Sequence, residues 1–264
     1  MITSMSNPRV KQVLQWQTKA KDRRRDKVFI VEGRKMFEEA PKELVKEVYV
    51  SDGFMGYLGE QTYADKLAHT GYEVVSEEVF RKMSDTQTPQ GILAVLRQPE
   101  YHLQEILRKQ DVKQPFLFVL LENLQDPGNL GTIMRTAEGA GVTAVIMSST
   151  TVDLFNPKVI RATMGSVYRV PFLYEESLTD TLRILHENGV RSYAAHLQGE
   201  TYYDSFSFRE ATAFLIGNEG NGLTEELSRA ATSYLKIPME GKLESLNASV
   251  AASLLMYEAH RQRA

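Results

Sequence analysis

The segment from Phe116 to Gly141 constrains the fold of this chain more than any other stretch. It begins with an unbroken apolar run, FLFVLL, which predicts a strand buried on both faces, as in the middle of a parallel sheet. A turn-forming sequence, QDPG, follows, and apolar residues then recur at helical spacing. We expect Asn129 to cap this helix. Because ligands of open α/β sheets bind beyond the carboxyl ends of strands, Asn129 and Arg135 are the side chains we expect to matter.

The rest of the chain alternates predicted strands and helices, which indicates an α/β protein. Its 264 residues are enough for two hydrophobic cores. We expect a small α/β domain over residues 1–96, a linker over 97–115 and a domain with a mostly parallel sheet over 116–264. In that second domain we expect strands near 116–121, 143–148, 168–173, 191–196, 212–216 and 234–237, and helices near 130–140, 157–163, 178–188, 223–231 and 246–261.

A basic arm near the amino terminus stands out against a formal net charge of -3. It contains eight positive residues: Arg9, Lys11, Lys19, Lys21, Arg23, Arg24, Arg25 and Lys27. One interpretation is a solvated helix with a charged outer face. The other is an RNA-binding surface, since clustered Lys and Arg side chains bind phosphates through counterion release. Charge alone does not decide between them.

Composition excludes several classes of site. The chain has no cysteine, so disulfides and thiolate metal sites are impossible. Its five histidines are scattered without ligand spacing, so we expect no metal. The sequence has neither an apolar signal-peptide core nor a segment long enough to span a membrane, and we expect a cytoplasmic protein without a membrane partner.

A glycine-rich loop, GNEGNGLT, follows the predicted strand at 212–216. It differs from the phosphate-binding loop pattern at Leu223, where the lysine would stand, and Glu219 would place a carboxylate against phosphates. The dinucleotide fingerprint is also absent, which disfavours a nicotinamide dehydrogenase. What remains is a backbone turn that can approach a flat, uncharged group closely, or simply a strand-to-helix turn.

A third polar loop, IPMEGKLESLNAS, precedes the predicted terminal helix. Ser245 or Asn247 can cap that helix, and small residues occupy its first turns. Taken singly, such a sequence is more often a helix cap than a catalytic device.

Three segments carry a family resemblance: NLQDPGNLGTIMRTAEGAGV, FLIGNEGNGLTEEL and IPMEGKLESLNASVAASLLMYE. Together they resemble the three ordered motifs of the SpoU, or TrmH, family of RNA ribose 2'-O-methyltransferases. The amino-terminal NPRVKQVLQWQTKAKDRRRDKVFIVEG resembles, more weakly, the L30e-like substrate-binding domain of many members. The resemblance implies S-adenosylmethionine as methyl donor and an RNA substrate. Ribosomal RNA is the preferred expectation for that substrate, and transfer RNA is the alternative. It also implies a deep trefoil knot in the second domain and a homodimer formed through that domain.

The resemblance also assigns residues. It implies catalytic roles for Asn129, Arg135, Glu219, Ser245 and Asn247. It implies cofactor contacts from Leu197, Gly217, Asn218, Gly222, Ile237, Met239 and Leu246.

The role of Arg135 stays open at this stage. The family assigns it the removal of the hydroxyl proton, but a guanidinium has a pKa above about 12 and donates hydrogen bonds without accepting them. It could instead hold an RNA phosphate, or merely pair with Glu138 on the helix surface.

A non-catalytic RNA-binding or ribosome-assembly protein with the same fold is the alternative function.

Overall fold

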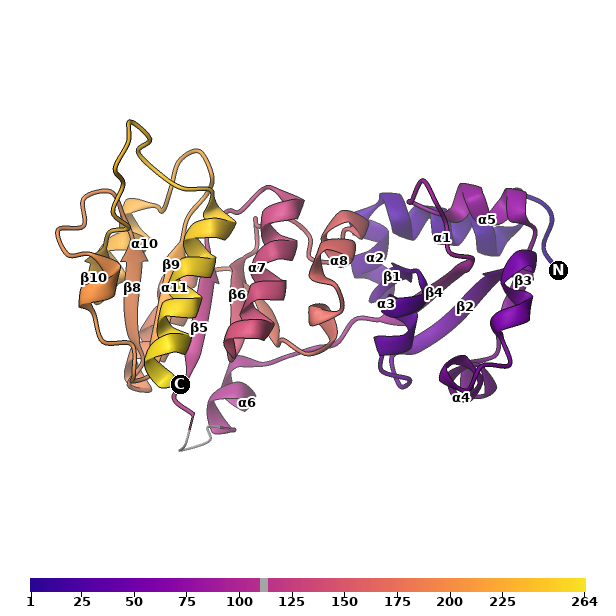
Figure 1. The fold of residues 1–264 in the computed structure, drawn as a ribbon, viewed down its shortest axis with the longest axis horizontal. Helices are drawn as coiled ribbons and strands as arrows, with labels where there is room; N and C mark the ends of the chain where they lie inside the picture. The colour runs from indigo at the N-terminus through magenta and orange to yellow at the C-terminus, as the bar shows by residue number, and fades with distance from the viewer. Residues whose placement is uncertain (110–113) are drawn as a thin grey trace. The chain divides into compact units, whose positions relative to one another are not determined.

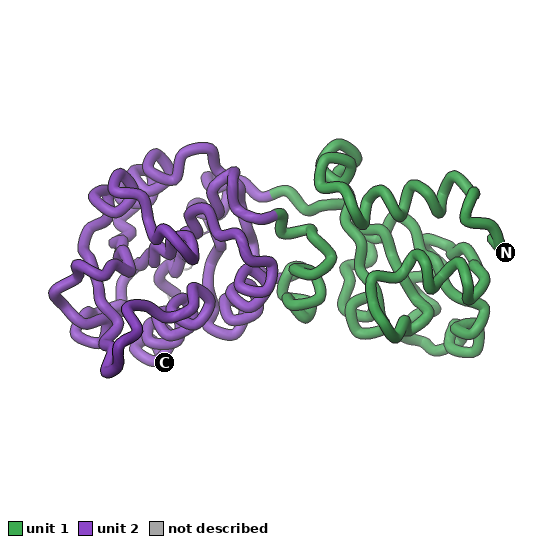
Figure 2. The backbone as a smooth tube through the Cα atoms, turned by 90° about the horizontal axis from the view of Figure 1, so that it is seen from above, with its two compact units in different colours: residues 1–100, 153–168 green, residues 101–152, 169–264 purple. Residues whose placement is uncertain are grey.

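The computed structural model describes residues 1–109 and 114–264, which form two compact units. The first contains Met1–Glu100 and Asp153–Tyr168, and the second contains Tyr101–Val152 and Arg169–Ala264 (Figure 2). The linker expected over 97–115 is described only in part, because residues 110–113 lie outside the described residues. Residues 153–168, which the sequence analysis placed in the second domain, contribute to the first unit.

The first unit is built on a four-stranded sheet in the order β1-β4-β2-β3. β4 pairs antiparallel with β1 and β2, and β3 pairs parallel with β2. The strands are β1 (Val28–Glu32), β2 (Val45–Ser51), β3 (Glu73–Val75) and β4 (Ile92–Arg97). The helices are α1 (Pro8–Thr18), α2 (Ala20–Asp26), α3 (Arg34–Glu39), α4 (Gln61–Thr70), α5 (Glu77–Met83) and α8 (Pro157–Thr163), with short 3-10 turns at Asp52–Tyr57 and Ser166–Tyr168.

Apolar side chains explain this arrangement. Helix α1 buries Val10, Val13 and Trp16 in a core with strand residues such as Ile30 and Leu93. Burying a side chain of this size contributes about 1.5–3 kcal/mol.

The segment 153–168 joins the first unit through aromatic and ionic contacts. The ring of Phe155 lies 4.8 Å from that of Phe29 on β1, and Asp153 forms an ion pair with Arg23 on α2. Sequence periodicity predicted the α8 helix but carries no information about the sheet against which it packs.

The second unit contains a six-stranded sheet in the order β10-β8-β9-β5-β6-β7, and every pairing in it is parallel (Figure 1). Its strands are β5 (Leu117–Leu121), β6 (Ala144–Ser148), β7 (Phe172–Glu175), β8 (Arg191–Ala195), β9 (Thr212–Ile216) and β10 (Ser233–Leu235). The predicted α/β class and mostly parallel sheet are confirmed. The strand expected at 168–173 is wrong in position, because a 3-10 turn at Ser166–Tyr168 precedes β7.

The helices of the second unit cover this sheet. They are α6 (Leu103–Arg108), α7 (Pro127–Ala140), α9 (Leu178–Glu187), α10 (Glu225–Ala230) and α11 (Ala248–Arg263). Helices α7 and α11 pack side by side (Figure 1), and a hydrogen bond of 3.2 Å joins Ser253 to Thr136 between them. Strands β5 and β9 are parallel neighbours, so the loops that follow them meet at one edge of the sheet.

Candidate active site

The turn after β5 sets the position of Asn129. Asp126, and not Asn129, caps α7: its Oδ1 accepts the backbone N–H of Asn129 at 2.8 Å. The cap expected at Asn129 is wrong because Pro127, whose fixed φ suits the first helical position, already lies inside the helix. Asn129 therefore lies in the first helical turn, where it is 7% exposed.

The carboxylate of Glu219 joins the loop after β9 to the turn after β5. Its Oε1 accepts hydrogen bonds from the side-chain amide of Asn129 and from the N–H of Asp126, each at 3.0 Å, and its Oε2 accepts the N–H of Gln125 at 3.1 Å. Burial raises the pKa of Glu219, but the hydrogen bonds from these three donors and from its own N–H together outweigh it, and the pKa lies below its ordinary value. The structure thus holds an ionised carboxylate against Asn129.

The glycine-rich loop after β9 closes into a tight turn. Asn218 and Gly222 exchange two backbone hydrogen bonds, of 3.0 and 2.9 Å. A Cβ atom on Gly217 would lie 2.1 Å from the carbonyl carbon of Gly222, so only glycine fits there. At the end of the loop, the buried Glu122 accepts hydrogen bonds from the N–H and hydroxyl of Thr224 at 2.7 and 2.8 Å.

Glu122 holds this loop, a role that was not identified from the sequence. It follows the apolar strand directly as a carboxylate, and it is 9% exposed. A charged residue at the end of a buried strand was the available signal.

A cavity of about 440 Å³ adjoins this loop. All seven residues expected to contact a cofactor line it: Leu197, Gly217, Asn218, Gly222, Ile237, Met239 and Leu246. Glu219 and Ser245 line it as well, whereas Asn129, Arg135 and Asn247 do not. The volume lies in the range of small-molecule sites.

Two chain segments run parallel to each other beside this cavity, joined by a β-bridge between Tyr202 and Lys236. The N–H of Lys236 donates to the carbonyl of Thr201 at 3.0 Å, and the N–H of Tyr203 donates to the carbonyl of Lys236 at 2.9 Å. A Cβ atom on Gly199 would lie 2.9 Å from the backbone of Leu235, so the two segments approach closely there.

Asn247 caps the terminal helix α11. Its Oδ1 accepts the N–H of Ser249 at 2.9 Å and the Ser249 hydroxyl at 2.7 Å. Ser245 is exposed two residues earlier.

Arg135 lies on a different face of α7 from Asn129. It is exposed, and its side chain makes no hydrogen bond or ion pair with any residue in the described part of the chain. The surface pair with Glu138 does not form, because the Glu138 carboxylate binds Arg169, with a hydrogen bond of 3.1 Å to one of its Nη atoms. The Arg135 guanidinium is therefore available to an external ligand.

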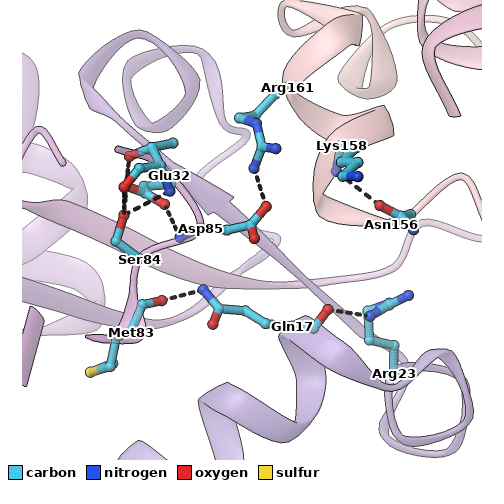
Figure 3. A network of polar contacts seen from close by, with 10 residues as sticks. Gln17, Arg23, Glu32, Met83, Ser84, Asp85, Asn156, Lys158 and Arg161 are labelled. Atoms are coloured by element: carbon cyan, nitrogen blue, oxygen red, sulfur yellow. Dashed lines mark hydrogen bonds and ion pairs between the residues drawn. The ribbon is translucent and has the colours of Figure 1, made fainter. Parts of the chain in front are cut away.

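The basic arm divides into structural and exposed residues. Arg23 is only 3% exposed: its guanidinium contacts the Asp153 carboxylate at 2.5 Å and the carbonyl of Trp16 at 2.6 Å. The expectation that Arg23 contacts RNA is therefore wrong. Figure 3 shows its position, with Gln17 nearby, in a polar network of the first unit.

Other cations of the arm have local partners. Arg9 pairs with Glu73, Arg25 with Asp22 and Asp26, and Lys27 with Glu100, all at the surface. Among the described residues, Lys11, Lys19, Lys21 and Arg24 are the members of the arm whose side chains are exposed and form no ion pair.

The same network includes residues far apart in the sequence (Figure 3). Glu32 accepts hydrogen bonds from the Ser84 hydroxyl at 2.5 Å and from the N–H of Asp85 at 3.0 Å. Asp85 in turn pairs with Arg161 on α8. Sequence reasoning missed this cluster, since its members come from β1, the loop before β4 and α8.

The part of the chain that the structure describes contains neither a metal-binding cluster nor a membrane-spanning helix. No three His, Asp or Glu side chains there are grouped so that they could hold a metal ion. No helix there is long and apolar enough to cross a membrane.

Comparison with known proteins gives two domain matches. Residues 116–257 match the SpoU rRNA Methylase family, and residues 7–94 match the MRM3-like substrate binding domain.

Individual proteins resemble the chain along nearly its whole length. The 23S rRNA (guanosine(2553)-2'-O)-methyltransferase RlmP of Bacillus subtilis is 35% identical over 260 residues, with 97% of each chain covered. The AdoMet-bound rRNA methyltransferase from Sinorhizobium meliloti is 31% identical with a TM-score of 0.84, covering 98% of this chain and 97% of the other. The SpoU methyltransferase AviRb from Streptomyces viridochromogenes, in complex with AdoMet, is 26% identical with a TM-score of 0.83, covering 97% of this chain and 98% of the other.

Proposed function

The chain belongs to the SpoU rRNA Methylase family, and from this membership we propose that it transfers a methyl group from S-adenosylmethionine to a ribose 2'-hydroxyl of ribosomal RNA. One observation carries the proposal. The seven residues expected to contact the cofactor line a single cavity, and Glu219 in its wall bonds to Asn129. The similarity to RlmP, over 97% of both chains, supports ribosomal RNA, and specifically a guanosine, over transfer RNA.

The cavity suits S-adenosylmethionine. Its walls combine the apolar side chains of Leu197, Ile237 and Leu246 with the backbone of the glycine-rich loop. Such walls accept an adenosine by packing and by backbone hydrogen bonds. When bound, the cofactor supplies a methyl group activated by a positively charged sulfur.

The chain's own residues align the nucleophile. Glu219 fixes Asn129 and the turn at Asp126, so that the loops after β5 and β9 hold one geometry. Ser245 and Asn247 lie where the third loop enters α11 and would hold the ribose. Fixed positioning of this kind lowers the entropic part of the barrier.

We assign Arg135 to the RNA phosphate. Its guanidinium is exposed and unpaired in the described part of the chain, and no carboxylate there is bonded to it that could take up a proton. A bidentate contact to a phosphate uses its donors as they are. A neighbouring RNA phosphate would then assist removal of the 2'-hydroxyl proton.

The first unit would bind the RNA. Lys11, Lys19, Lys21 and Arg24 supply exposed positive charge on α1 and α2 and at the junction between them. This unit matches a substrate binding domain, which supports the assignment.

A homodimer through the second unit is part of the proposal. Val250, Leu254 and Tyr257 form an exposed apolar stripe on α11, with exposed fractions of 46%, 37% and 50%. They line a groove of about 600 Å³ that reaches Thr132 on α7. Exposed apolar stripes of this kind are typical of subunit interfaces.

The trefoil knot and the cytoplasmic location remain predictions.

Ribose-methylation mapping tests the function. Ribosomal and transfer RNA from cells with and without the gene should differ at one 2'-O-methylated nucleotide of 23S rRNA. Purified protein should restore that methyl group from labelled S-adenosylmethionine, and Arg135→Ala should not. A non-catalytic assembly protein would leave every methylation site unchanged while still binding RNA.

A further inference from the structure

A second cavity, of about 370 Å³, shares the glycine-rich loop with the cofactor cavity. The proposed reaction does not use it. Four side-chain amides line it, those of Asn123, Gln125, Asn218 and Asn221. Its other lining residues are glycine, leucine and threonine, so no charged side chain of the described residues lines it. Such a cavity suits a planar, uncharged group that both donates and accepts hydrogen bonds.

Two of these amides are held in fixed orientations. Asn123 adopts a left-handed φ of 56°, which asparagine tolerates, and its Oδ1 accepts the Ser148 hydroxyl at 3.3 Å. Gln125 donates its Nε2 to the carbonyls of Asn123 and Thr150 at 3.1 and 3.0 Å. Within the described chain, the Nδ2 of Asn123 and the Oε1 of Gln125 have no partner.

The other two amides differ in availability. Asn218 uses both ends: its Nδ2 donates to the Asn123 carbonyl at 2.7 Å, and its Oδ1 accepts the N–H groups of Gly220 and Asn221. The Asn221 side chain makes no hydrogen bond to any described residue. The cavity thus offers a donor on Asn123, an acceptor on Gln125, and both on Asn221.

We propose that this cavity binds a nucleobase of the substrate RNA, with guanine as the preferred base. Guanine presents an acceptor, O6, beside two donors, N1–H and N2–H. The Asn123 amide meets the first, and the oxygens of Gln125 and Asn221 meet the other two. A phosphate is disfavoured because no cation lines the cavity. The cavity would read the base while the neighbouring one holds the methyl donor, and in this respect the inference rests on the proposed function.

Asn123→Asp tests the base contact with minimal change in shape. The substitution keeps the oxygen that accepts from Ser148, tolerates the left-handed backbone and removes the unpaired donor at residue 123. Asn221→Ala removes an amide whose side chain bonds to no described residue, and Gln61→Glu, exposed at the start of α4, controls for added charge.

The first readout is kcat/KM on transcripts carrying each of the four bases at and beside the methylated nucleotide. We expect the wild type to prefer guanine at one of these positions. Asn123→Asp should lower kcat/KM for that base by about tenfold, the effect of one lost hydrogen bond, and should shrink the preference. The affinity for S-adenosylmethionine should stay unchanged. Equal loss for all four bases at every tested position, or weaker cofactor binding by Asn123→Asp, overturns the base pocket.

The second readout does not require turnover. Titration of the protein with GMP, followed by NMR of side-chain amides, should shift the Asn123, Gln125 and Asn221 resonances in the wild type and much less in Asn123→Asp. Absence of these shifts overturns the pocket even if methylation occurs. If methylation fails while the shifts appear, the proposed reaction is wrong and the pocket stands.

Discussion

The side-chain amide of Asn129 donates a 3.0 Å hydrogen bond to the carboxylate of Glu219, which lies 90 residues later in the chain. Asn129 lies in the first turn of α7, which follows β5, and Glu219 lies in the loop after β9; β5 and β9 are adjacent parallel strands. The contact therefore depends on the register of the sheet as well as on the two side chains.

This contact gives a pH-dependent prediction for Glu219→Gln. The folded-state pKa of Glu219 is lowered, so its stabilisation is fully present above the ordinary value of 4.5 and is lost as the pH falls through the lowered pKa. We expect Glu219→Gln to melt at a lower temperature than wild type at pH 7 and the gap to narrow below pH 4.5. Glu225→Gln, at a surface pair with Arg229, should show no such gap. A gap that persists unchanged at low pH would contradict an ionised Glu219.

Arg135→Ala should slow methylation strongly without unfolding the protein. The side chain is exposed and unpaired among the described residues, so the melting temperature should stay within about 1 °C of wild type. We expect kcat to fall by about 10²-fold or more. Arg135→Lys should rescue little, since lysine lacks the bidentate geometry. Arg183→Ala, at an exposed position on α9, is the matched control. Full activity of Arg135→Lys would exclude a bidentate clamp.

Arg23→Met should destabilise the first unit and should not act mainly through RNA. Its ion pair with Asp153 is 3% and 11% exposed, and breaking such a buried pair costs about 3–5 kcal/mol. Urea unfolding should report this loss. Arg24→Met, one position later and exposed, should change the free energy of unfolding by less than about 0.5 kcal/mol. Equal stabilities of the two variants would contradict the structural role of Arg23.

Neutralising exposed cations of the arm should weaken RNA binding in a salt-dependent way. For Lys21→Gln with Arg24→Gln, we expect the slope of log K against log salt to fall by about 1.5, since each phosphate contact contributes about 0.7–0.9. Filter binding to 23S rRNA transcripts between low and moderate salt measures this slope. The matched pair Arg183→Gln with Arg229→Gln removes the same charge from helices of the second unit. If both pairs change the slope equally, the arm has no special role.

The sequence predicted those features of the fold that follow from local pattern. The apolar run at 116–121 predicted a buried strand, and Leu117–Leu121 is the fully buried β5. The rule that ligands bind beyond the carboxyl ends of parallel strands singled out the turn after β5, and this turn meets the loop after β9 through Glu219.

The sequence did not predict the features that depend on tertiary packing. Arg23 looks like its neighbours in a charged run, and only the approach of Asp153, 130 residues away, buries it. The helix at 157–163 was recognisable, but its contribution to the first unit was not. The cap of α7 was misplaced by three residues because Asp126 and Asn129 are both good capping residues, and the helical position of Pro127 decided between them.

Gly217→Ala should destroy the cofactor cavity, whereas Gly220→Ala should spare it. The added Cβ at residue 217 would lie 2.1 Å from the backbone carbon of Gly222, so the turn closed by Asn218 and Gly222 must open. At residue 220 the nearest atom is the Asn218 Oδ1 at 3.5 Å, an ordinary contact. We expect S-adenosylmethionine binding, measured by calorimetry, to weaken at least about tenfold in the first variant and to stay within about twofold in the second. Both glycines lie in one loop, so the comparison separates close backbone packing from general loop flexibility. Equal affinities would show that the turn seen here is not the cofactor-binding form.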